Sequence, residues 1–176
     1  MAGVPTAKLV FVDESGANTQ MTRRYGRSPV GQRLICPVPQ GHYQTSTLIA
    51  AVRLNGPQAP WLFEGPMDGE LFLAWVKQGL APCLRRDDVV ILDNLATHKV
   101  AGVREAIEGA GARLEYLPPY SPDFNPIENL WSKVKQAMKS REPRTARHLF
   151  EAAGAAFDTV IPEDCQGFFL HAGYAT

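Results

Sequence analysis

Two aspartates in this chain follow strongly apolar segments in the same way. Asp13 ends the run Lys8-Leu9-Val10-Phe11-Val12, and Asp93 ends the run Asp88-Val89-Val90-Ile91-Leu92. Such continuous apolar runs are typical of strands that are buried on both faces of a sheet. A single acid at the end of a strand is usually a turn former. Two acids placed alike favour a polar site where strand ends and loops meet.

A third acid, Glu128, lies in the proline-rich segment 117–131. Asn125 is a suitable helix N-cap and Pro126 suits the first helical position, so Glu128 falls in the first turn of a predicted helix. Two interpretations stay open at this point. Glu128 is either the acid of a capping box, which only stabilises the helix start, or the third acid of a site.

One face of this predicted helix combines the acid with lysines. At 100° per residue, a narrow stripe contains Glu128, Ser132, Lys135 and Lys139. The neighbouring stripe is apolar and contains Ile127, Trp131, Val134 and Met138. The helix is therefore expected to pack on the core with one edge and to present an acid followed by two lysines with the other. Lysines so placed could bind phosphates, although a solvated charged face is the competing interpretation.

Three converging carboxylates would repel one another and raise one another's pKa. A divalent cation bound between Asp13, Asp93 and Glu128 would remove that conflict. Oxygen ligands without His or Cys spacing indicate Mg²⁺ or Mn²⁺ rather than zinc. Two such ions about 4 Å apart could hold both the attacking and the leaving oxygen of a phosphodiester.

The elements that must position these acids form an α/β pattern. Strands are expected to end at Asp13 and Asp93, and a hairpin around Gly41 is expected to join two more. These further strands are predicted at 33–38 and 45–54, and a fifth at 113–117. Helices are predicted after Asp68, within 100–110, at 126–140 and at 144–160, with a short helix or coil from 162. The prediction is a five-stranded mixed sheet, three strands antiparallel and then two parallel, flanked by helices.

The whole-chain composition narrows the class of protein. The chain has 176 residues and an apolar fraction of 45%, which suits a single domain over 1–176 with C-terminal helices from about 144. No stretch is long and apolar enough to span a membrane, and no secretory signal is present, so the cytoplasm is the expected location. The three cysteines are far apart and lack the spacing of a disulfide framework or zinc site.

The charge balance argues against a simple DNA-binding module. Lys and Arg total 18, as do Asp and Glu, so the net charge is zero, whereas a dedicated DNA-binding domain is usually basic. An enzyme acting on DNA is not excluded, because acids that hold metal offset basic patches elsewhere.

The motifs around the acids resemble those of a known family. Asp93 and Glu128 are separated by 34 residues (128 − 93 − 1). The matching motifs are Val10-Phe11-Val12-Asp13-Glu14-Ser15, then Val90-Ile91-Leu92-Asp93-Asn94 with His98-Lys99, then the loop 117–128, with Tyr25-Gly26-Arg27 and Ala172-Gly173-Tyr174 as lesser ones. In these motifs and this spacing the chain resembles the DDE transposases of the mariner-like superfamily, in particular their bacterial insertion-sequence branch.

This resemblance implies an RNase H-like fold and implies that Asp13, Asp93 and Glu128 bind two Mg²⁺ or Mn²⁺ ions. It also implies cleavage of DNA at transposon ends and strand transfer into target DNA, typically at a TA dinucleotide. A homodimer is a further expectation. Members of the family carry an N-terminal helix-turn-helix DNA-binding domain, whereas here the first catalytic strand starts near residue 8. That domain is therefore expected to be separate or missing, as in a truncated chain, a split reading frame or a decayed copy.

Further residues are candidates for supporting roles. Asn94 and His98 could orient a carboxylate or a phosphate, although polar residues at a helix start are an equal interpretation. Glu14 is expected to lie outside the site of Asp13, because neighbours in a strand point to opposite faces. Candidates for the DNA backbone are Arg23, Arg24, Arg27, Lys99, Lys135 and Lys139. A solvated loop is the alternative for the arginines, and Trp61, Trp75 and Trp131 are predicted to be core residues.

Two other functions compete with that of a transposase. One is an RNase H-type nuclease, which cleaves without strand transfer. The other is a decayed or domesticated domain that only binds DNA or a protein. The proline-rich loop and the acid spacing favour a transposase over the nuclease, and the complete set of three acids argues against a decayed domain.

Overall fold

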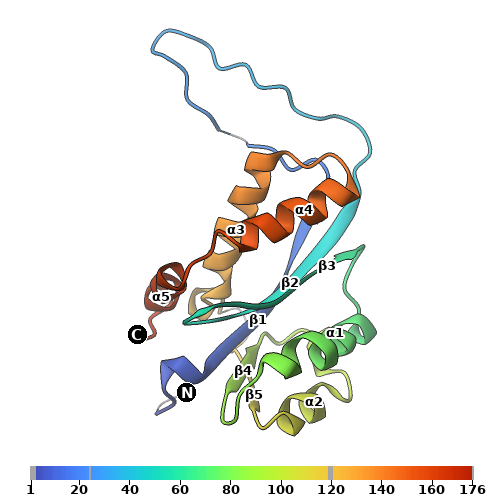
Figure 1. Ribbon diagram of the computed structural model, residues 1–176, viewed down its shortest axis with the longest axis vertical. Coiled ribbons are helices and arrows are strands. Elements are labelled where there is room, and N and C mark those ends of the chain that lie inside the picture. Colours follow the sequence, from blue (N-terminus) through green and yellow to red (C-terminus); the bar gives the residue numbers. More distant parts are fainter. Residues whose placement is uncertain (1–2, 24, 119–120, 176) are drawn as a thin grey trace.

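The computed structural model describes residues 3–23, 25–118 and 121–175 and shows a mixed sheet with helices on both faces (Figure 1). The strands are β1 Leu9–Asn18, β2 Thr45–Arg53, β3 Gly56–Glu64, β4 Val89–Leu92 and β5 Arg113–Tyr116. The α-helices are α1 Gly69–Trp75, α2 Val103–Gly109, α3 Ile127–Arg141, α4 Ala146–Phe157 and α5 Pro162–His171. Short helical turns lie at Thr6–Lys8, Val76–Leu80, Ala81–Cys83, Ala96–Lys99 and Pro122–Phe124.

The strand order in the sheet is β3-β2-β1-β4-β5. Strand β2 pairs antiparallel with both β1 and β3, while β4 pairs parallel with both β1 and β5. The reason lies in the connections: a tight turn joins β2 to β3, whereas α1 and α2 carry the chain back before β4 and β5. The predicted class, a five-stranded mixed sheet flanked by helices, is confirmed.

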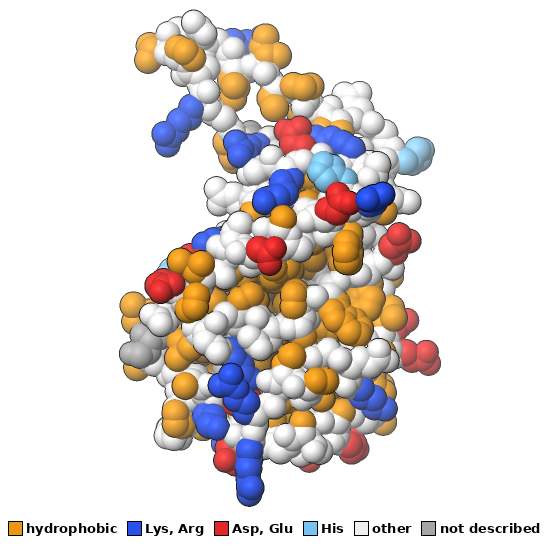
Figure 2. All heavy atoms as spheres, viewed as in Figure 1, with side chains coloured by type: hydrophobic (Ala, Val, Ile, Leu, Met, Phe, Trp, Pro, Cys, Tyr) orange, Lys and Arg blue, Asp and Glu red, His pale blue; other side chains and the backbone are white. Residues whose placement is uncertain are grey.

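One predicted strand is wrong. Residues 33–38 are not part of the sheet but belong to an extended arm, which leaves the end of β1 and returns at the start of β2 (Figure 1). The apolar side chains of the arm are exposed, as the upper part of Figure 2 shows. They include Tyr25, Val30, Leu34, Ile35, Val38 and Tyr43.

The missing third strand is β3, which the sequence pattern did not reveal. Pro57 and Pro60 interrupt it, and a proline cannot donate a hydrogen bond within a sheet. They are tolerated because β3 lies at the edge of the sheet, where one side of the strand has no neighbour. The sheet therefore has the expected number of strands with a different third member.

Side chains alternate between the two faces of the sheet along the central strands, so each face has its own hydrophobic core. Phe11 of β1 and Ile91 of β4 face the core beneath α3, α4 and α5. Val10 and Val12 of β1 face the core beneath α1 and α2. Polar side chains at the ends of these strands follow the same alternation. The face that a strand-end acid occupies is therefore set by its position in the strand.

The starts of two helices match the sequence closely. Asp68 caps α1, since its Oδ1 accepts a hydrogen bond from the Leu71 backbone N–H at 2.8 Å. Helix α3 begins at Ile127, one residue later than expected, and Asn125 Oδ1 lies 3.4 Å from the Ile127 backbone nitrogen that donates to it. None of the described helices combines the length and apolarity needed to cross a membrane.

Candidate active site

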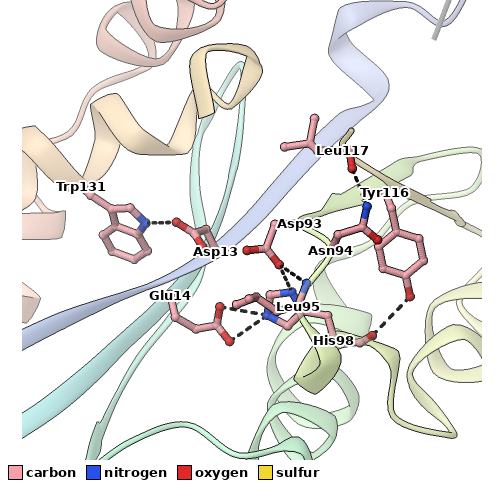
Figure 3. Close-up of polar contacts among 9 residues, drawn as sticks. All are labelled: Asp13, Glu14, Asp93, Asn94, Leu95, His98, Tyr116, Leu117 and Trp131. Atoms are coloured by element: carbon pink, nitrogen blue, oxygen red, sulfur yellow. Dashed lines mark hydrogen bonds and ion pairs between the residues drawn. The ribbon is translucent and has the colours of Figure 1, made fainter. Parts of the chain in front are cut away.

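Asp13 and Asp93 end up side by side because β1 and β4 are parallel neighbours. Phe11 pairs with Ile91 in the register of these strands. Each aspartate lies two residues beyond its member of this pair, so both belong to the same face at the same end of the sheet. Neighbouring strands are about 4.8 Å apart. The two strand-end acids therefore lie side by side at this end of the sheet (Figure 3).

Glu128 lies in the first turn of α3, which packs on the same face of the sheet, close enough to Asp13 for their charges to interact. Burial, together with the negative charges of Glu14, Glu128 and Asp93, raises the pKa of Asp13 from 3.8 to about 7, although a hydrogen bond from a backbone N–H opposes this shift. The Glu128 side chain is exposed, and in the described part of the chain it makes no capping-box hydrogen bond back to the start of α3. The arrangement favours Glu128 as an acid of the site over the capping-box interpretation.

The donor set of this site suits a hard divalent cation. All three side chains offer carboxylate oxygens, which Mg²⁺ and Mn²⁺ prefer, and a cation would relieve the crowding of negative charge at Asp13. Within residues 3–23, 25–118 and 121–175, no three His, Cys, Asp or Glu side chains are already gathered closely enough to hold an ion. One oxygen of Asp13, Oδ2, instead accepts a hydrogen bond from the Trp131 indole Nε1 at 3.2 Å. Binding an ion therefore requires side-chain adjustment, for which the exposed Glu128 is free.

His98 links Asp93 to a fourth acid, Glu14. The ring Nδ1 lies 2.6 Å from Asp93 Oδ1, and Nε2 lies 2.9 Å from both carboxylate oxygens of Glu14 (Figure 3). Glu14 faces away from Asp13, as alternation along a strand implies. The sequence did not indicate its contact with His98: the turn Ala96–Lys99 brings His98 beneath the strand ends, where the ring reaches both carboxylates.

The electrostatics of this link favour a charged His98. Burial lowers the pKa of His98, but the contacts with Asp93 and Glu14 outweigh burial and raise it to about 9. Burial acts to raise the pKa of Asp93, and His98, the Leu95 backbone N–H and Lys99 together bring it below its ordinary value. Asp93 is thus held ionised at neutral pH.

Asn94 has a different role from the one that its position beside Asp93 suggests. Its Nδ2 donates to the Leu117 backbone carbonyl at 3.0 Å, where the loop that leads to Glu128 begins. The far end of that loop is held by Tyr174, whose hydroxyl donates to the Phe124 carbonyl at 2.9 Å. Asn94 and the C-terminal Tyr174 therefore position the loop instead of touching an acid of the site.

Trp131 is a site residue that sequence reasoning placed only in the core. It is 3% exposed and packs in the core beneath α3, as predicted, yet it also donates to Asp13. The signal available in the sequence was the indole N–H itself, because a buried tryptophan usually finds an acceptor for it.

A basic groove leads away from the acids along α3. Arg23, Lys135 and Lys139 line adjoining parts of this groove, whose volumes are about 610 and 620 Å³. Burial and Lys139 lower the pKa of Lys135, while Glu128 and Asp13 act in the opposite direction. Lys135 therefore lies between the acids and the next lysine. Tyr25 also lines the groove.

The remaining candidates for the DNA backbone lie elsewhere. Arg27 is an exposed residue of the arm. Lys99 belongs to the same helical turn as His98, and its Nζ lies 5.4 Å from the centre of the Tyr116 ring. Arg24 lies outside the described residues. The structure thus brings together three of the six basic side chains that the sequence singled out.

Burial of Asp13 and its neighbouring acids predict an unusual pH dependence of stability in the metal-free chain. The folded-state pKa of about 7 lies above the ordinary 3.8, so this carboxyl costs nothing below pH 4 and increasingly opposes folding between pH 4 and 7. Asp13→Asn should therefore stabilise the chain by roughly 2–4 kcal/mol at pH 8 and have little effect at pH 4. Urea unfolding in chelator measures this, with the exposed Asp158→Asn as control. An equal effect of Asp13→Asn at both pH values would contradict it.

Comparison with known proteins assigns the chain to a class. Residues 8–149 match the family described as DDE superfamily endonuclease. The chain therefore belongs to the DDE superfamily endonucleases, as its motifs indicated. It is also similar to the transposase of the transposable element Tcb1 from Caenorhabditis briggsae. The two are 22% identical over 196 aligned positions, which cover 97% of this chain and 70% of that protein.

Solved structures with the same fold come from the Mos1 transposase. The Mos1 strand transfer complex matches with a TM-score of 0.70 and 15% identity, covering 95% of this chain and 51% of the Mos1 chain. The catalytic domain of Mos1 mariner transposase matches with a TM-score of 0.61 and 13% identity, covering 97% of this chain and 85% of that domain. The chain thus spans about half the length of Mos1 in the complex. The expected RNase H-like fold is confirmed.

Proposed function

We propose that this chain is the catalytic domain of a DNA transposase, in which Asp13, Asp93 and Glu128 bind two Mg²⁺ or Mn²⁺ ions. The observation that carries the proposal is the placement of Asp13 and Asp93 at the adjacent ends of the parallel strands β1 and β4, with Glu128 in the first turn of the helix that packs on the same face. The Mos1 catalytic domain, which shares the fold, has been solved with Mg and with Mn. The reaction would be cleavage at transposon ends and joining of the freed 3′ ends to target DNA.

The side chains around the site have different roles in holding the acids and the DNA phosphates. Divalent ions bound there would supply Lewis-acid stabilisation of the charge that develops on the phosphate oxygens. Trp131 and His98 fix the two aspartates at the ends of rigid strands. Glu128, exposed in the first turn of α3, can adjust as the third ligand. Lys135, next along the groove, can hold a phosphate beside the acids.

The proposed partner is DNA, which the basic groove would grip through its backbone. Related proteins support this, since Mos1 structures include a strand transfer complex and a paired-end complex with a left transposon end. Contacts to phosphates carry no sequence information. Specific recognition of transposon ends would therefore need a separate element such as a helix-turn-helix domain. A TA target and a homodimeric assembly complete the proposal.

The test is cleavage and joining of a duplex that carries the element's ends, using the chain fused to its DNA-binding domain. With Mg²⁺ we expect nicked products bearing 3′-hydroxyls and, with target DNA added, joined products. Excess chelator should abolish both. Cleavage that persists in chelator would contradict the metal-dependent mechanism, and cleavage without any joined product would instead indicate a nuclease.

The groove yields a prediction on DNA binding. Lys135→Ala with Lys139→Ala should weaken binding of the isolated chain to duplexes of any sequence and reduce the slope of log affinity against log salt by about 2, since each phosphate contact contributes about 0.9. The matched control is Lys77→Ala with Arg85→Ala, two exposed basic residues away from the groove. Fluorescence anisotropy over a range of salt concentrations measures both. An equal loss in the control pair would show that only net charge matters.

A further inference from the structure

Glu14 occupies a position that the three-acid site does not itself explain. It follows Asp13 in β1 but points to the opposite face, where its side chain is only 13% exposed. Both of its oxygens lie 2.9 Å from His98 Nε2. A carboxylate that is removed so far from water usually has a specific partner that compensates its charge. Here that partner is a residue 84 positions away in the chain.

The geometry around His98 determines what the ring can do. Ionised carboxylates only accept hydrogen bonds, and each ring nitrogen faces one, Asp93 on one side and Glu14 on the other. Nε2 therefore donates to Glu14, while Nδ1 forms a close ion pair with Asp93 whose geometry falls short of a hydrogen bond. The ring is fully buried and lies against Phe72, with 4.3 Å between ring centres. The backbone carbonyl of His98 also accepts from the Tyr116 hydroxyl at 3.3 Å. His98 is thus a rigid, charged link between two acids.

The link acts on one oxygen of Asp93. Oδ1 contacts His98 Nδ1 at 2.6 Å and accepts from the Leu95 backbone N–H at 3.0 Å. The other oxygen, Oδ2, takes part in neither contact. Asp93 lies just beyond the end of β4 and is 35% exposed, so its side chain would rotate more freely without this support.

We infer that Glu14 is a positioning residue that acts through His98 to fix the Asp93 carboxylate, with Oδ2 left for a divalent cation. The inference rests on the proposed function. Groups that hold metal ligands in place typically change metal affinity 10–100-fold when they are removed. A direct ligand role for Glu14 does not fit, because both of its oxygens face His98 on the other side of the sheet.

The test is Mn²⁺ binding to the isolated chain without DNA, followed by the electron paramagnetic resonance signal of free Mn²⁺. Glu14→Ala should weaken binding about 10–100-fold. Glu14→Gln keeps an oxygen that can accept from His98 and should weaken it less, by about fivefold. Asp93→Asn should weaken binding more than either. The matched control is Glu151→Gln, which removes one charge from an exposed ion pair on α4 and should leave binding unchanged.

A second readout separates positioning from a loss of folding. In chelator, the imidazole ring of His98 should show a downfield Nε2–H proton by NMR in the wild type and in Glu14→Gln. Glu14→Ala should lose the Nε2 signal. Thermal unfolding in chelator establishes that each variant is folded at the temperature of the titration. If Glu14→Ala does not fold, Glu14→Gln and the NMR signals still decide the question.

The outcomes distinguish this inference from the proposed function. Wild-type affinity in Glu14→Ala would overturn the positioning role while leaving the three-acid site intact. A loss in Glu14→Gln as large as that in Asp93→Asn would overturn it as well, because Glu14 would then be a ligand. No Mn²⁺ binding by the wild type at millimolar concentration would overturn the proposed metal site and this inference together.

Discussion

Asp93→Asn is expected to leave the fold intact and to reduce DNA strand cleavage about a thousandfold or more. The substitution barely changes the volume of the side chain, and the Asn oxygen can still accept from His98 and Leu95. It removes one of three anionic ligands, and metal ions contribute several kcal/mol to catalysis, where about 1.4 kcal/mol is a tenfold change in rate. The pKa of Asp93 lies below its ordinary value, so the wild-type side chain is ionised throughout the neutral range.

This effect is measured by gel assays of single-strand nicks under Mg²⁺ in the fused protein. Asn94→Ala is the matched neighbour, because Asn94 holds the loop at Leu117 and contacts no acid of the site. We expect a milder loss from that variant, on the order of tenfold. Near-normal cleavage by Asp93→Asn would rule out a carboxylate–metal mechanism at this site.

The largest effect on stability is expected from Asp88→Ala. Asp88 and Arg53 form a buried ion pair at the other end of the sheet, with 2.7 Å between Asp88 Oδ2 and Arg53 Nη2 and side chains 0% and 2% exposed. Asp88 Oδ2 also accepts from the Arg85 backbone N–H at 2.7 Å. Removal of the carboxylate leaves a charged guanidinium unpaired in the interior, which costs about 3–5 kcal/mol.

The double variant Arg53→Met with Asp88→Leu distinguishes the cost of one unpaired buried charge from the contribution of the ion pair itself. Apolar side chains of similar volume should recover most of the stability, because the pair also carries a cost of desolvation. Chemical denaturation of the three proteins gives the free energies of unfolding. A double variant less stable than Asp88→Ala would show that the pair itself stabilises the fold. Mn²⁺ affinity should stay at the wild-type value in every folded variant, since the pair lies far from the acids.

Sequence patterns predicted the parts of the site that depend on local order. The apolar runs before Asp13 and Asp93 identified both central strands, and their parallel register then brought the two acids together. Periodicity along residues 127–139 placed Glu128, Lys135 and Lys139 on one side of α3 while Trp131 was buried. In each case the signal is short-range, because strand and helix periods decide which side chains share a face.

What the sequence left undetermined depends on contacts between distant residues. The alternation of side chains along a strand places Glu14 on the opposite face from Asp13, but nothing in the sequence spacing indicates that His98 contacts it there. Strand β3 was not predicted because it contains prolines, which are excluded from central strands but tolerated at the edge of a sheet. The arm was misread because Leu34, Ile35 and Val38 resemble strand residues, although the structure leaves them exposed.

If Asp13, Asp93 and Glu128 share divalent cations, crystals soaked in Mn²⁺ should reveal the ions by anomalous diffraction. We expect anomalous peaks within about 2.3 Å of carboxylate oxygens from all three side chains, with two peaks about 4 Å apart when both sites are filled. Glu128 should turn toward the aspartates relative to its exposed position in the metal-free chain. Peaks that involve only one of the three acids, or that lie elsewhere on the molecule, would show that the three acids do not form a shared metal site.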